Sequence, residues 1–258
     1  MPEGTGETVR LTVLDADGTE IDSFHSDIPA EKEDREGFYC TADTGMNEFW
    51  WSMRHPEGPK MNDTDFHGRP AGPLTLPGDY SVRLDIGDFS QTQPFTLLLD
   101  PRIDTSIEDL EAQFALQMQI RDRLSEVTTA INRCRTLKTM LGGWAGRLDE
   151  IDGGGDAASG ARELSDKIDA IERKLVQPDL ASEGDSLNYR EQLWEKLADL
   201  VPVVASADAK PTAQSYAVFE KLSGEMDPHL SVLDELIAGD LAALNDALGA
   251  LGVDVVDA

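Results

Sequence analysis

The sequence predicts an α+β protein, in which an antiparallel β-sandwich of the immunoglobulin or fibronectin type over residues 1–101 is followed by a long antiparallel helical bundle over residues 102–258. Residues 1–101 hold 9 of the 13 prolines and 10 of the 16 aromatic residues. Short alternating segments with turn signals between them, as found there, are typical of small antiparallel sandwiches. The rest of the chain is rich in Leu, Ala, Glu and Asp at helical spacing. We therefore expect a domain boundary near Pro101.

Alternation of apolar and polar residues marks the expected strands. Residues 9–15 alternate, Asp17-Gly18 favours a tight turn, and residues 21–24 complete a hairpin. A second hairpin is expected over residues 80–99, with its turn at Gly87-Asp88. A strand over residues 47–54 would point three apolar side chains to one face and Trp50 to the other. These are Phe49, Trp51 and Met53.

Four helices are expected in the second half. Thr105 and Glu108 form a capping-box pattern that opens the first helix, and Gly142-Gly143 is expected to end it. A flexible link follows at residues 153–160. The second helix is expected over residues 164–175. The third is expected over residues 189–204, where Pro202 would bend or shorten the helix. The last is expected over residues 211–248, with Pro211 in its first turn.

The chain carries a formal net charge of -28, and both halves share the acidic excess. This distribution indicates a whole-surface property, which fits either a protein adapted to high salt or an ordinary acidic protein. Duplex nucleic acid and anionic membrane surfaces are expected to be poor partners, because the sequence has no basic patch that would release counterions. The sequence has no run of 18 apolar residues and no signal peptide, so membrane insertion is not expected. Localisation stays open, since a longer precursor would allow an extracellular or cell-surface protein.

Two cysteines, Cys40 and Cys134, fall in different predicted domains, and we expect both to be free thiols. The four histidines lack the spacing of a zinc site or of a nucleophile and base pair. They are His25, His55, His67 and His229. We therefore expect no catalytic residue and no cofactor.

Two acidic clusters suit hard cations by residue type, but each has a simpler explanation. Asp15, Asp17, Glu20 and Asp22 surround an expected hairpin turn and lack calcium-loop spacing. Asn62, Asp63, Asp65 and His67 lie in a long loop over residues 55–76, which a solvated acidic segment explains better than a metal site. No metal ligands are therefore predicted.

Trp50 is the residue most suggestive of an interaction. An outward tryptophan on a strand packs within its own sandwich, docks a neighbouring domain or stacks on a sugar, and all three interpretations stay open. Because the long loop adjoins this strand, the candidate partner-binding residues are Trp50, His55, Phe66 and His67.

Two segments resemble a known protein family. Residues 45–56 read Gly-Met-Asn-Glu-Phe-Trp-Trp-Ser-Met-Arg-His-Pro, and residues 72–84 read Gly-Pro-Leu-Thr-Leu-Pro-Gly-Asp-Tyr-Ser-Val-Arg-Leu. They resemble the block that follows the β-propeller in bacterial and archaeal sortilin-type proteins with BNR-like repeats, which are often labelled glycosyl hydrolases. Residues 109–114, 120–124, 187–189 and 208–216 are similar to the C-terminal part of the same family. The sequence departs from the family's block at Glu48, Ser52 and His55, and throughout residues 57–71.

The resemblance implies a non-catalytic docking or assembly module whose partner is a β-propeller or another protein. The sequence has no Asp-box repeat and no blade period, so the hydrolytic label of the family would belong to a propeller that these residues do not contain. The alternative is a carbohydrate-binding accessory module or a fragment of a BNR-repeat glycosyl hydrolase. Self-association through the helical half is a further alternative.

Overall fold

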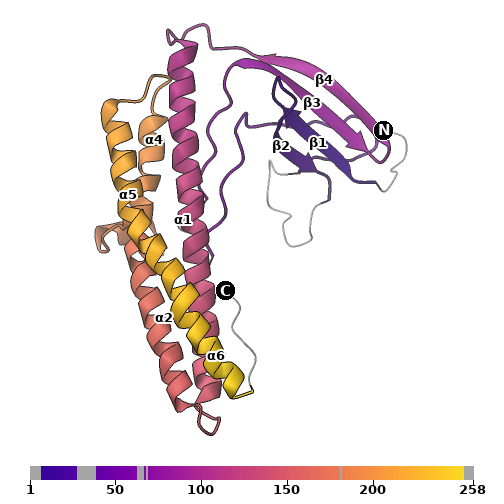
Figure 1. Ribbon diagram of the computed structural model, residues 1–258. Helices are drawn as coiled ribbons and strands as arrows, with labels where there is room; N and C mark the ends of the chain where they lie inside the picture. Colours follow the sequence, from indigo (N-terminus) through magenta and orange to yellow (C-terminus); the bar gives the residue numbers. More distant parts are fainter. Residues whose placement is uncertain (1–6, 28–38, 63–66, 68, 181, 253–258) are drawn as a thin grey trace. The chain divides into compact units, whose positions relative to one another are not determined.

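The computed structural model describes residues 7–27, 39–62, 67, 69–180 and 182–252 (Figure 1). These residues form an α+β protein with one antiparallel sheet and several long helices. The chain divides into two compact units. The sheet unit holds residues 1–56, 72–115 and 208–210, and the helical unit holds residues 57–71, 116–207 and 211–258.

This division differs in two ways from a single boundary near Pro101. Residues 57–71, within the predicted long loop, belong to the helical unit although they fall between segments of the sheet unit. The first turns of the longest helix, as far as Ala115, belong to the sheet unit. Composition changes gradually along a chain, so it could not reveal that a loop packs with helices.

The sheet unit is built on four antiparallel strands in the order β2-β1-β3-β4. Both predicted hairpins are present. The strands are β1 (Val9–Leu14), β2 (Glu20–His25), β3 (Gly78–Ile86) and β4 (Phe89–Leu97). Gly18 and Gly87 take positive φ angles of 81° and 52° in the two turns, a conformation that glycine adopts without a steric penalty.

Pairing register gives the sheet one apolar face. Val9, Leu11 and Val13 of β1 pair with Ile86, Leu84 and Val82 of β3, and because side chains alternate, all six lie on the same side of the sheet. The opposite side carries mainly polar residues, among them Arg10, Thr12, Arg83 and Asp85. The apolar face is therefore the one that needs a cover.

The predicted strand over residues 47–54 is wrong. This segment is irregular, and its one bridge joins Arg54 to Leu74. Met53 has a φ of 55°, which ends the expected alternation because an extended strand requires negative φ. The inward and outward directions of residues 49–51 are nonetheless as predicted, with Phe49 and Trp51 partly buried and Trp50 exposed.

From residue 107 on, the described residues form three long helices and five shorter helical segments. They are α1 (Ile107–Leu148), α2 (Gly155–Leu175), η1 (Glu183–Leu187), α3 (Leu193–Ala198), α4 (Leu200–Val204), α5 (Ala213–Leu236), η2 (Ile237–Leu241) and α6 (Ala242–Ala250). Within the helical unit α2 returns alongside α1, and α5 continues through η2 into α6 (Figure 1). Among the described residues, no helix combines the length and the apolar character that crossing a membrane requires.

Several helix boundaries differ from those predicted. α1 continues through Gly142 and Gly143 to Leu148, because neither glycine takes the positive φ of a helix C-terminal cap. The hydroxyl of Ser106, rather than that of Thr105, accepts the backbone N–H of Asp109 at 3.2 Å. The expected helix over residues 189–204 is instead two short helices, with Pro202 in the first turn of α4, where its missing N–H costs no hydrogen bond.

One hydrophobic core joins α1, α2, α5 and α6. Its α1 residues recur every three or four positions, which keeps them on one face of the helix. They are Leu116, Ile120, Leu124, Val127, Ile131, Cys134, Leu137, Leu141, Ala145 and Leu148. Cys40 and Cys134 are both buried free thiols, as predicted.

Candidate functional site

Trp50 is displayed on the surface of the sheet unit, with 80% of it exposed. Three other large apolar residues near it in the chain or across the Arg54 to Leu74 bridge are also exposed. They are Met46 at 98%, Met53 at 46% and Leu74 at 48%. We refer to Met46, Trp50, Met53 and Leu74 as the exposed apolar set.

Aromatic contacts hold the neighbours of Trp50 against the sheet. The Phe49 ring lies 4.6 Å from the ring of Phe24, and the Trp51 ring lies edge-on to Phe95 at 6.2 Å. Phe95 in turn stacks on Tyr80 at 5.8 Å. Because the residues on both sides of Trp50 are anchored, the backbone at Trp50 is fixed while its side chain is free to meet a partner.

Hydrogen bonds fix the segment at both ends. Before Trp50, the side chain of Asn47 closes a loop by accepting the N–H of Asp43 and donating to its carbonyl, both at 2.9 Å. After Trp50, the N–H of His55 donates to Pro73 at 2.9 Å, and that of Thr75 donates to Met53 at 2.7 Å. The display of Trp50 is therefore preorganised.

Glycine is required at position 72, next to the hydrogen bonds that join residues 53–55 to residues 73–75. A Cβ atom on Gly72 would lie 1.8 Å from the carbonyl oxygen of His55, which no side chain tolerates. The guanidinium of Arg54 also donates to the carbonyl of Gly72 at 3.0 Å. This close approach gives a physical reason for Gly72.

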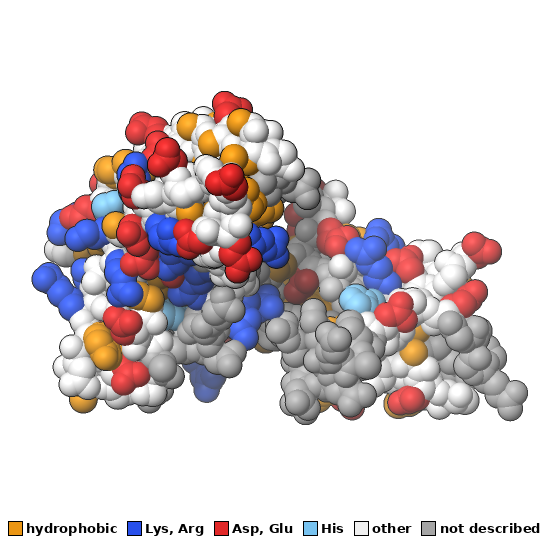
Figure 2. All heavy atoms as spheres, turned by 90° about the horizontal axis from the view of Figure 1, so that it is seen from below, with side chains coloured by type: hydrophobic (Ala, Val, Ile, Leu, Met, Phe, Trp, Pro, Cys, Tyr) orange, Lys and Arg blue, Asp and Glu red, His pale blue; other side chains and the backbone are white. Residues whose placement is uncertain are grey.

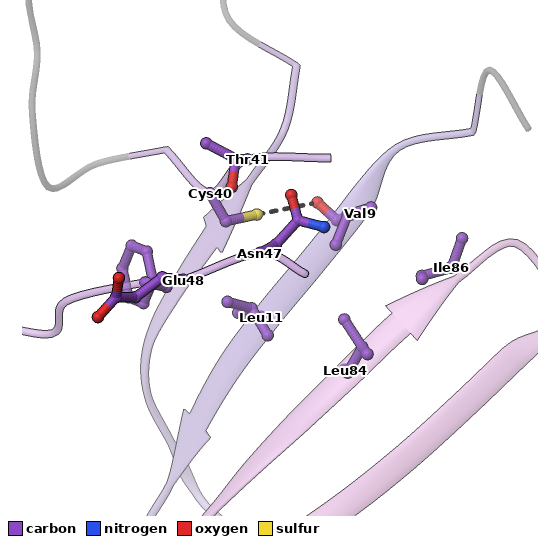
Figure 3. A pocket seen from close by; sticks show the side chains of 9 residues that line it. Val9, Leu11, Cys40, Thr41, Asn47, Glu48, Leu84 and Ile86 are labelled. Carbon is purple, nitrogen blue, oxygen red and sulfur yellow. Dashed lines mark hydrogen bonds between the residues drawn. The ribbon is translucent and has the colours of Figure 1, made fainter. Parts of the chain in front are cut away.

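A half-open pocket of about 270 Å³ lies against the apolar face of the sheet (Figure 3). Val9, Leu11, Leu84 and Ile86 form its floor, and the segment around Cys40 and residues 47–49 forms its wall. The Cys40 thiol donates to the carbonyl of Val9 at 3.5 Å. Burial raises the pKa of this thiol, so it is a poor nucleophile.

His55, a predicted partner-binding residue, is half-buried. Its ring lies 4.9 Å from the ring of Phe114, which belongs to the same unit. His55 thus packs internally, and it contributes less to an open surface than Trp50. Phe66 lies outside the described residues.

His67 is buried in the helical unit and is not a surface residue. Its Nε2 atom lies 2.9 Å from Oε1 of Glu195, and its ring meets Trp194 edge-on at 5.4 Å. Glu195 also accepts the backbone N–H groups of Gln177 at 2.8 Å and Gln192 at 2.9 Å. Burial acts to raise the pKa of Glu195, but these hydrogen bonds outweigh it and hold the pKa below its ordinary value.

The described residues of 57–71, which we call the strap, are anchored to α1 at several points. Met61 is fully buried in the core of the helical unit. Asn132 accepts the N–H of Asn62 at 2.7 Å and donates to the carbonyl of Lys60 at 2.9 Å. The guanidinium of Arg135 donates to the carbonyl of Asn62. The strap is therefore a structural part of the helical unit.

A cluster of charges joins α1 to α2. Glu172 is 2% exposed and lies 2.7 Å from both Arg135 and Lys138. Lys138 also contacts Asp169 at 2.6 Å. Desolvation acts to lower the pKa of Lys138, but its two acidic partners raise it above the ordinary value. These charges compensate one another, which fits a structural role.

The acidic clusters have structural explanations where the residues are described. Asp15 accepts the N–H groups of Asp17 at 3.0 Å and Thr19 at 2.7 Å, so its carboxylate organises the turn between β1 and β2. In the described part of the chain, no three His, Cys, Asp or Glu side chains gather as metal ligands would. Asp63 and Asp65 lie outside that part.

The sequence contained weak signals for the two interactions that it did not predict. Met61 is an isolated apolar residue in a polar loop. Arg135 and Lys138 are three residues apart, as are Asp169 and Glu172, so each pair lies on one face of its helix. No pattern indicated which partners these residues would meet.

Comparison with known proteins finds no matching family model, curated protein or solved structure.

Proposed function

We propose that this chain is a non-catalytic docking and assembly module that binds a protein partner, and that this partner is a β-propeller. The exposed, preorganised Trp50 is the observation that carries the proposal. The propeller rests on the resemblance to sortilin-type proteins, which implies a module that follows such a domain.

The physical argument is the cost of leaving Trp50 in water and the benefit of burying it. Tryptophan is enriched among the residues that dominate protein interfaces, and one buried at an interface centre contributes about 2 kcal/mol or more. The anchored neighbours of Trp50 reduce the entropy lost on binding, because the backbone that presents the ring is already ordered. Met46, Met53 and Leu74 supply further apolar area around it.

The environment of the buried ionisable groups supports a role without catalysis. Glu195 is occupied by His67 and two backbone donors, and Glu172 by Arg135 and Lys138. Groups that are fully engaged by internal partners are poor candidates for proton transfer to a substrate. The net negative charge of the surface repels strongly acidic partners, and it therefore favours a partner that lacks a strongly acidic face.

We further propose that the sheet unit is an immunoglobulin-like sandwich and that the helical unit is an antiparallel bundle. The apolar face formed by β1 and β3 supports the first assignment, since sandwiches cover such a face with a second layer. The core shared by α1, α2, α5 and α6 supports the second.

The test is a binding experiment with a matched control. The chain serves as bait in a pull-down from its native source in molar potassium chloride, and retained proteins are identified by mass spectrometry. Wild type is compared with Trp50→Ala and with Leu98→Ala, which removes a side chain that is 85% exposed elsewhere in the sheet unit. We expect a propeller protein to be retained by wild type and Leu98→Ala and lost with Trp50→Ala.

A glycan array run with the same three proteins separates docking from sugar binding. An exposed indole also suits stacking on a sugar ring. Glycan binding that disappears with Trp50→Ala, together with no retained propeller, would contradict the docking proposal and favour a carbohydrate-binding accessory module.

A further inference from the structure

The two edges of the sheet are protected very differently. β2 and β4 are the edge strands (Figure 1). β2 carries Glu20 and Asp22, its register with β1 shifts between Val13 and Leu14, and its end at His25 is bridged to Tyr39. Charges, irregular register and covering segments are the devices by which proteins prevent an edge from pairing with another chain.

β4 has almost none of these devices. No charged residue occurs from Phe89 to Leu99, although charged residues make up 28% of the chain. β4 is a regular nine-residue strand, and six of its first seven residues are exposed. No other strand in the described ranges pairs with its outer edge. Pro94 is its one protective feature.

Pro94 shows which backbone groups of β4 point outward. Its nitrogen carries no hydrogen, so its pairing with Ser81 fits the type of antiparallel pair that exchanges no hydrogen bonds. Hydrogen-bonded and non-hydrogen-bonded pairs alternate along an antiparallel ladder. Ser90, Thr92 and Thr96 are therefore in non-hydrogen-bonded pairs as well, and their backbone N–H and C=O groups point away from β3. The two-residue turn at Gly87-Asp88 agrees, because it closes on the hydrogen-bonded pair Ile86 and Phe89.

We propose that the outer edge of β4 accepts an extended, basic segment of a partner protein as a fifth strand of the sheet. In this mode of recognition main-chain hydrogen bonds give affinity, and alternate side chains give specificity. The outward N–H groups of Ser90, Thr92 and Thr96 supply the donors. Phe89, which is 52% exposed, supplies apolar contact on one side of the new strand.

The charges around β4 define the chemistry of the segment. Residues 78–100 contain four Asp and one Arg, which gives a net charge of -3. Asp79 accepts the hydroxyl of Thr96 at 2.7 Å, and Asp85 accepts that of Ser90 at 2.6 Å while also pairing with Arg83 at 3.0 Å. Both carboxylates therefore lie beside β4 on one side of the sheet, and Asp79 is the one without an ion pair to Arg83. Lys or Arg at alternate positions of an incoming strand would meet them. A second copy of this chain, also at -28, would be repelled.

This inference is independent of the exposed apolar set, because it rests on the edge of β4 and not on Trp50. The probe is a fluorescein-labelled nine-residue peptide, blocked at both ends, in which lysine alternates with threonine and valine. One control peptide replaces each lysine by glutamate, and another carries N-methyl groups on alternate backbone nitrogens. Binding to the full chain is measured by fluorescence anisotropy at 0.2 M and 2 M potassium chloride.

The matched variants are Thr92→Pro and Thr92→Val. Thr92→Pro removes one outward donor and leaves the β3 ladder intact, as Pro94 does; loss of one net hydrogen bond is expected to raise Kd about fivefold. Thr92→Val keeps the donor and should leave Kd unchanged. The N-methylated peptide, which loses the N–H groups that would donate to the outward carbonyls of β4, tests the complementary hydrogen bonds without changing the protein and should not bind.

Three results would overturn the proposal. They are absence of saturable binding by the basic peptide up to about 1 mM, equal binding of the N-methylated or glutamate peptide, and equal binding of the basic peptide to the folded Thr92→Pro and Thr92→Val variants. A fourth result would overturn the choice of partner. If sedimentation detected self-association of the chain and Thr92→Pro abolished it, the segment that pairs with β4 would belong to a second copy of the chain and not to a basic partner protein.

Discussion

The burial of Met61 makes a strong prediction about stability. Replacing Met61 by alanine removes Cγ, Sδ and Cε from a fully buried site in the core of the helical unit. At about 0.8 kcal/mol for each buried group the loss is roughly 2.4 kcal/mol, and the cavity adds to it, so the free energy of unfolding should fall by about 2 to 5 kcal/mol. Denaturation followed by circular dichroism at 222 nm, in a fixed high salt concentration, measures this change in the helices.

Met46→Ala is the matched control, since the same side chain is removed from a site that is 98% exposed. Its effect on the free energy of unfolding should stay within about 0.5 kcal/mol. If Met61→Ala were as mild as Met46→Ala, the strap would not be part of the helical core. The reasoning that assigns residues 57–71 to the helical unit would then be refuted.

Three further predictions concern the thiols, the charge and one buried carboxylate. Thiol titration of denatured, unreduced protein should find both Cys40 and Cys134 free, and finding none would contradict the structure. The melting temperature should rise substantially from dilute buffer to molar potassium chloride, because the acidic side chains behind the net charge of -28 repel one another when little salt screens them. A melting temperature that does not change with salt would contradict adaptation to high salt and leave the interpretation as an ordinary acidic protein. The pKa of Glu195 is lower in the folded state than its ordinary value of 4.5, so its ionised form stabilises the fold above that pH. The difference in unfolding free energy between wild type and Glu195→Gln should therefore be largest above pH 4.5 and shrink as pH falls through the folded pKa, whereas a difference that does not change with pH would rule out this role.

Local patterns in the sequence were sufficient to predict the hairpins and the main helices. Asp17-Gly18 and Gly87-Asp88 specify tight turns through chain-local chemistry, so both hairpins could be predicted. The buried residues of α1 recur with helical spacing, which a sequence shows directly. The prediction that Gly142 and Gly143 end the first helix was wrong, because a helix tolerates glycine when the residues around it are well packed.

Interactions between distant parts of the chain could not be predicted in the same way. The left-handed backbone at Met53 depends on its clamp to Thr75, and the burial of His67 depends on Glu195, 128 residues further along the chain. Alternation alone therefore extended the strand too far, and loop length alone made residues 55–76 look like a surface feature. The direction of Trp50, opposite to Phe49 and Trp51, could be predicted because it requires only the alternation of adjacent side chains, whereas its exposure depends on which segments cover that side and could not be predicted.

Charged side chains of both signs lie on the surface. Figure 2 shows acidic and basic side chains interspersed on the face in view. Exposed ion pairs such as Arg10 with Glu20 at 3.2 Å stabilise little individually, because water and salt screen them. The excess of acids over bases therefore governs solubility and the choice of partner more than it governs the fold.

The most direct test of the docking function is a titration of the purified propeller partner with wild type, Trp50→Ala and Leu98→Ala in molar potassium chloride. Docking through Trp50 predicts that Trp50→Ala weakens binding by about 30-fold or more, which corresponds to about 2 kcal/mol, while its melting temperature stays that of wild type. Leu98→Ala should bind as wild type does. Equal affinities for all three proteins would contradict docking through Trp50.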